Sequence, residues 1–90
     1  MADTESTLIE RGKNYGRFQS GATTMQNLKN VIRDNKGYEH LTAPQREALD
    51  MILHKVGRIV NGNAEHVDSW HDISGYAQLI ENQIKGIGEQ

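Results

Sequence analysis

The segment from residue 43 to residue 60 constrains the fold most, because it carries the signals of a complete amphipathic helix. Thr42 and Gln45 have the spacing of a capping box, and Pro44 suits the first helical turn. Gly62 is expected to end the helix, because glycine readily takes the left-handed conformation found at many helix ends. One apolar face, about 120° wide, consists of Leu49, Ile52, Leu53, Val56, Ile59 and Val60.

Three other segments have helical periodicity. Residues 66–85 form the clearest of them, residues 22–33 the next, and residues 5–11 the weakest. The short connection after residues 43–60 predicts a C-terminal antiparallel helical hairpin. We therefore expect an all-α fold, a small helical bundle of three to four helices in a single domain, residues 1–90. The apolar face of the last helix, about 80° wide, consists of Trp70, Ile73, Ala77, Ile80 and Ile84.

The small size of the chain predicts association with a second copy. A domain of 90 residues buries only about 60–65% of its unfolded surface, and this sequence contains no cysteine that could form a disulfide. A homo-oligomer is the remaining route to a larger core. We expect Trp70 to lie in that core or in the interface.

The net charge and the length of the apolar runs argue against two classes of partner, DNA and membranes. The net charge is −2 and the charges are mixed, so direct DNA binding is not expected. No apolar run approaches the roughly 18 residues that span a membrane, and the N-terminus lacks the pattern of a secretory signal. We expect a cytoplasmic protein with no membrane partner.

The two last helices each carry a pair of carboxylates. Glu47 and Asp50 lie on the first of them, and Asp68 and Asp72 lie on the second. Mg²⁺ and Mn²⁺ prefer such oxygen ligands, so four carboxylates on two antiparallel helices predict a site for one of these ions. The alternative, favoured by the residues alone, is that these acids face solvent in surface pairs worth a few tenths of a kcal/mol.

Other side chains near these acids suggest phosphate chemistry. Lys55 and Arg58 could bind phosphate oxygens, and His54 on the same polar stripe is a candidate general base. Tyr15 or Tyr76 is a candidate contact to a base or another ligand. Each histidine also has an ordinary interpretation as a surface side chain.

The segment from Arg11 to Phe18 is predicted to be a basic and aromatic loop between two glycines. It either contacts phosphate and stacks on a base, or its rings pack on the helices. Packing of Tyr15 and Phe18 on the helices is the interpretation that we favour.

The motifs resemble those of a small uncharacterised family found in phages and prophages. The matching segments are residues 47–59, Gly62 and residues 68–79, together with Glu10-Arg11 and Tyr15–Phe18. This resemblance implies a phage-type protein that acts in a bacterial cytoplasm, but it implies no activity.

A more distant resemblance is to the all-α nucleoside triphosphate pyrophosphatases of the MazG and dimeric dUTPase type. The chain lacks their denser first motif, Glu-Glu-x-x-Glu, and its second acidic pair is spaced by four. The resemblance implies Mg²⁺ (or Mn²⁺) on the four acids and a nucleoside triphosphate as partner, with pyrophosphohydrolysis as the activity. Two alternatives stay open: a non-catalytic protein that inhibits a host defence or nucleic-acid-processing protein, and a protein that sequesters nucleotides.

Overall fold

The computed structural model describes residues 4–87, and this part of the chain contains helices and no strand. It confirms the all-α fold class and the predicted bounds of the last two helices to within one residue. The elements are α1 Thr4–Tyr15, α2 Phe18–Arg33, the 3₁₀-helix η1 Lys36–His40, α3 Ala43–Asn61 and α4 Val67–Ile84.

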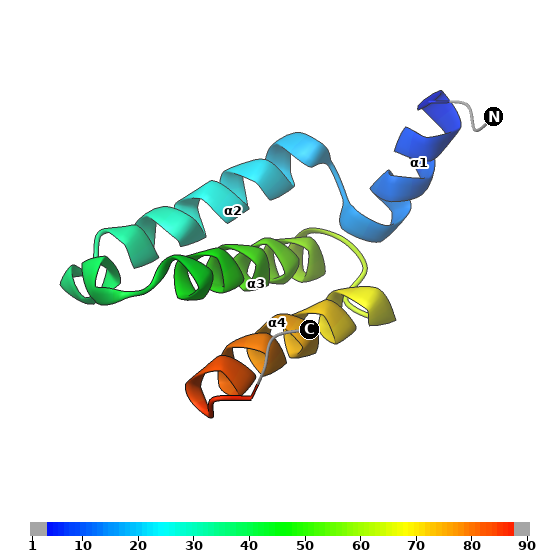
Figure 1. The fold of residues 1–90 in the computed structure, drawn as a ribbon. Helices are drawn as coiled ribbons and strands as arrows, with labels where there is room; N and C mark the ends of the chain where they lie inside the picture. The colour runs from blue at the N-terminus through cyan, green and yellow to red at the C-terminus, as the bar shows by residue number, and fades with distance from the viewer. Residues whose placement is uncertain (1–3, 88–90) are drawn as a thin grey trace.

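Helices α2, α3 and α4 run side by side as one layer with α3 in the middle, and α1 lies across one end (Figure 1). Two ion pairs show which sides of α3 its neighbours occupy. Asp50 lies 3.8 Å from Arg33 of α2, whereas Lys55 lies 2.9 Å from Asp72 of α4. Asp50 and Lys55 are about 140° apart around the helix, so α2 and α4 flank α3 on nearly opposite sides. The predicted C-terminal hairpin is the α3–α4 half of this layer.

Helix α3 starts with the predicted capping box, but Gly62 ends it for a different physical reason from the one predicted. The Thr42 side chain accepts a hydrogen bond from Gln45 N, and the Gln45 side chain accepts one from Thr42 N. At the other end Gly62 has φ −132°, so the expected left-handed conformation is wrong. Glycine is needed for space instead, because a Cβ there would overlap the backbone of Asn14 and Tyr15.

The predicted loop between the first two helices is also wrong. Helix α1 continues through Gly12 to Tyr15, and α2 begins at Phe18, four residues before the predicted start. The break falls at Gly16, which has φ +77° and packs so closely on Asn61 that a Cβ would overlap its carbonyl oxygen. A glycine inside a helix costs only about 1 kcal/mol, which explains why Gly12 does not end α1.

The sequence gives no strong signal for η1, which was missed. At the start of η1 the Asn35 side chain accepts a hydrogen bond from Gly37 N. The 3₁₀-helix continues to His40. His66 occupies the N-cap position of α4 without a side-chain capping bond.

The interior of the described chain is small. Ala48 and Ser69 are buried, but no large side chain among the described residues is fully buried. The Trp70 ring, expected in the core or an interface, is 55% exposed while its Nε1 donates to Ala64 O over 2.8 Å. Trp70 is therefore outside the core of the single chain. None of the described helices is long and apolar enough to cross a membrane.

Candidate functional site

The four predicted metal ligands do not come together. Asp50 faces α2 and Asp72 faces α3, each toward a cation. Asp68 is largely exposed at the start of α4, with an oxygen 4.0 Å from His66 Nε2, and Glu47 is exposed on α3. Within residues 4–87 no group of three or more histidine or acidic side chains could hold a metal ion. The acids of one described chain therefore do not fit a magnesium centre, and magnesium binding stays a prediction.

Lys55, the first predicted phosphate-binding residue, is engaged in the layer. Its Nζ lies 2.9 Å from Asp72 Oδ2, and only 12% of its side chain is exposed. The hydrogen bond from Lys55 holds the pKa of Asp72 below its usual value. Lys55 thus joins α3 to α4, and its ammonium group is not available to a phosphate in this arrangement.

Three other predicted residues meet in one cavity. The cavity has a volume of about 400 Å³ and lies between α1, α2 and α3. That volume is within the range of small-molecule sites, about 300–1,000 Å³. Its lining includes Tyr15, His54 and Arg58, and the other lining residues are Leu8, Arg11, Gly12, Gly16, Arg17, Phe18, Gly21, Ala22, Met25 and Asn61.

The charges around this cavity are of one sign. Arg11, Arg17 and Arg58 contribute to the lining, and no aspartate or glutamate does. Among the described residues, none of these three arginines forms an ion pair with a carboxylate. The chain as a whole has a net charge of −2. Three arginines in the lining therefore give this part of the described chain a local positive charge on an otherwise acidic protein.

The Tyr15 ring organises one wall of the cavity. The Arg58 guanidinium carbon lies 4.2 Å from the centre of that ring, a cation–π contact. His66 meets the same ring edge-on, with the two ring centres 5.4 Å apart, and its Nε2 lies 3.4 Å from the Tyr15 hydroxyl. Within residues 4–87, Arg58 is thus held by a ring and not by a carboxylate, and its N–H groups keep their capacity to donate to an anion.

Phe18 has a different position from the one expected. Its side chain is 88% exposed at the start of α2 while it also lines the cavity. Packing of Phe18 on the helices, the favoured interpretation from the sequence, is therefore wrong. Tyr15 does pack, since it is half-buried against Arg58 and His66. Together the two rings place apolar surface beside the arginines.

His54 lines the cavity from α3. Partial burial lowers the pKa of His54, and the nearby charges of Arg58, Lys29 and Lys55 lower it further. A lowered pKa keeps the imidazole neutral at neutral pH, so one ring nitrogen can accept a proton or a hydrogen bond. The position is compatible with the predicted role as a general base.

Asn61 joins the walls of the cavity. Its Nδ2 donates to Tyr15 O over 2.8 Å and to Arg17 O over 2.9 Å. Asn63 N also donates to Asn14 O over 2.6 Å. The end of α3 therefore fixes the α1–α2 junction, and with it the Tyr15 ring and the Arg17 backbone.

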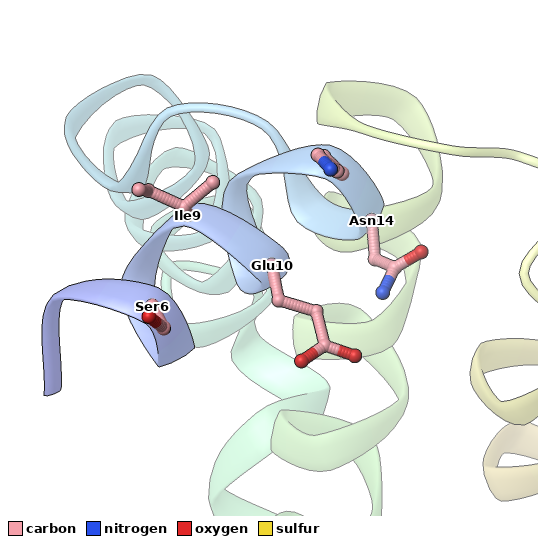
Figure 2. A pocket seen from close by; sticks show the side chains of 5 residues that line it. Ser6, Ile9, Glu10 and Asn14 are labelled. Atoms are coloured by element: carbon pink, nitrogen blue, oxygen red, sulfur yellow. The ribbon is translucent and has the colours of Figure 1, made fainter. Parts of the chain in front are cut away.

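A separate hollow lies along α1 (Figure 2). Its lining residues, which include Ile9, Glu10 and Asn14, all belong to α1, so there is no opposing wall from another element. Tyr76, the other predicted ligand contact, is on α4 and lines neither this hollow nor the cavity. We therefore take the cavity between three helices as the candidate site.

Comparison with known proteins gives a family but no activity. Residues 2–84 match the family described as Domain of unknown function (DUF6378). The chain belongs to the DUF6378 family. The comparisons with curated proteins and with solved structures found no match. Membership of an uncharacterised family is thus confirmed, whereas the phage origin and the relation to the pyrophosphatases stay predictions. A function for this DUF6378 protein is therefore argued from its own residues.

Proposed function

We propose that this DUF6378 protein binds the phosphates of a nucleotide in the cavity between α1, α2 and α3. The observation that supports the proposal is the presence of Arg11, Arg17 and Arg58 around one cavity without a carboxylate in its lining. Guanidinium groups donate to phosphate oxygens in a fixed, often bidentate geometry. The presence of three arginines in one lining favours an anion with several oxygens.

The apolar part of the lining favours an aromatic group on that anion. The exposed Phe18 offers a ring face, and Tyr15, Leu8 and Met25 add apolar surface. Bases stack on such rings with about 1–3 kcal/mol each. A nucleotide combines the charged and the flat parts that this lining would recognise. The distant resemblance to nucleoside triphosphate pyrophosphatases supports the same ligand class, and the resemblance to phage proteins supports a role in a bacterial host.

Binding is expected not to require magnesium, because none of the four acids lines the cavity. Isothermal titration calorimetry with nucleoside mono-, di- and triphosphates, each with and without Mg²⁺, measures this directly. Inorganic triphosphate and an unphosphorylated nucleoside separate the contribution of the phosphates from that of the base. Absence of saturable binding for every nucleotide would refute the proposal and leave the inhibitor of a host protein as the hypothesis to test.

Two variants and one control locate the site. Arg17→Gln and Arg58→Gln remove a cavity charge, whereas Arg33→Gln removes the same charge from the far end of α2, where Arg33 pairs with Asp50. Hydrogen bonds to charged groups contribute about 1.5–3 kcal/mol, so each cavity variant should weaken binding roughly tenfold or more. Arg33→Gln should bind as the wild type does, and an equal loss in all three would exclude the cavity.

Magnesium-dependent hydrolysis stays a separate prediction. Pyrophosphate release from a bound nucleoside triphosphate, lost in Asp68→Ala and Asp72→Ala, would confirm it. Saturable binding without release would support sequestration. The binding proposal does not depend on whether pyrophosphate is released.

A further inference from the structure

One side of the α2–α3–α4 layer is apolar and is not covered by the described chain. On α3, Leu49 is 36% exposed and Val60 is 67% exposed. On α4, Trp70 is 55% exposed and Ile84 is 73% exposed. We call these four residues, with Ala77 of α4, the apolar face.

The members of the apolar face lie on the same side of the layer. Leu49 and Val60 are about 20° apart around α3, and Trp70 and Ile84 are about 40° apart around α4, with Ala77 between them. Leu49 and Ala77 also line one groove of about 290 Å³ between the two helices. No charged residue contributes to the lining of that groove. The two helical stripes therefore form one continuous surface.

The area left exposed is large for a compact monomer. The chain exposes 6771 Å², whereas a compact monomer of 10.1 kDa exposes about 5,300 Å². The surplus is about 1,500 Å², and each partner in a stable protein dimer buries about 800 Å² or more. Summed over the whole chain, this surplus is larger than the area that each partner buries in a stable dimer.

We propose that a second copy of this chain covers the apolar face, so that two three-helix layers pack face to face. Stable domains are built from at least two packed layers, and this chain supplies a single one. A two-fold interface brings the same patch of each copy together, so it needs only a patch that is complementary to itself. A largely apolar surface meets that requirement mainly through nonpolar contacts, with Glu81 of α4, which pairs with Lys85, at its edge about 20° from Trp70 around the helix.

This interface would leave the candidate site open. Arg58 and Val60 are two positions apart on α3, which places them about 160° apart around the helix. The cavity and the apolar face therefore lie on opposite sides of the layer. Dimer formation and nucleotide binding can be measured independently, and the dimer does not rest on the proposed function.

Light scattering coupled to size-exclusion chromatography tests the proposal. The wild type should have twice the 10.1 kDa mass of the chain, and Val60→Glu/Ile84→Glu should have the mass of one chain. Leu79→Glu is the matched control, because Leu79 is 46% exposed on α4 but about 140° away from Ile84. The control should remain dimeric.

A second measurement needs no variant. If folding and association are coupled, the melting temperature of the wild type rises with protein concentration, whereas that of a monomer does not. A wild type with the mass of one chain and a constant melting temperature would overturn the proposal. So would a double variant that keeps the wild-type mass, or dissociation of the Leu79→Glu control.

Discussion

Replacing Asn61 with alanine removes the two hydrogen bonds that hold the α1–α2 junction against α3. Each intramolecular hydrogen bond contributes about 1 kcal/mol net, and a carbonyl left without a partner adds to the loss. The bonds to Tyr15 O and Arg17 O therefore predict a loss of about 2 kcal/mol in the free energy of unfolding. For a domain of this size, that loss corresponds to a fall of about 8–16 °C in the melting temperature.

Urea unfolding followed by far-UV circular dichroism, at one fixed protein concentration, measures this change. Asn61→Asp should lose more than Asn61→Ala, because a carboxylate oxygen replaces the donor opposite two carbonyl oxygens. Asn30→Ala is the control, since Asn30 is exposed on α2. If Asn61→Ala remains within about 0.5 kcal/mol of the wild type, the junction does not depend on this side chain.

Four further variants test other features of the structure. Gly16→Ala should lose at least about 2 kcal/mol in urea unfolding, because alanine is strained at φ +77° and its Cβ has no space. Thr42→Ala should lose about 1 kcal/mol through the capping box, and equal stability would contradict that role. For Asp72, whose folded pKa is lowered by Lys55, the stabilisation is present above about pH 4 and disappears as the pH falls through the folded pKa. When the free energy of unfolding is measured against pH, Asp72→Asn should lack this loss of stability at acid pH. The pKa of His54 is also lowered in the folded state, so the unfolded chain binds a proton at a higher pH than the folded chain does. The free energy of unfolding should therefore fall as the pH drops below about 6.5. His54→Gln should remove this pH dependence.

The last two helices could be predicted from the sequence because their boundaries depend on local chemistry. The capping box at Thr42 involves neighbours three residues apart, so it is visible in the sequence. The break at Gly16 was harder to predict, because Gly12 and Gly16 are equally good candidates by composition. What selects Gly16 is the close packing of Asn61, which is distant in the sequence.

The same distinction applies to the candidate site. Periodicity places His54 and Arg58 on one polar stripe of their helix, and both line the cavity together with Tyr15, which the sequence assigns to a loop. Periodicity does not say which neighbour each side of α3 faces, so the separation of Asp50 from Asp72 could not be derived. Asn61 was missed as a site residue because its role requires the folded junction. For Arg11, Arg17 and Phe18, the available signal was the run of basic and aromatic residues to which they belong.

The way α1 is attached has a consequence for any ligand in the cavity. No residue of α1 is buried, so this helix is held by the junction and by ring contacts instead of by a packed core. A ligand bound by both Arg11 of α1 and Arg58 of α3 would connect the two helices. Its binding energy would then contribute to keeping α1 in place, so the local stability of the N-terminal helix would report occupancy.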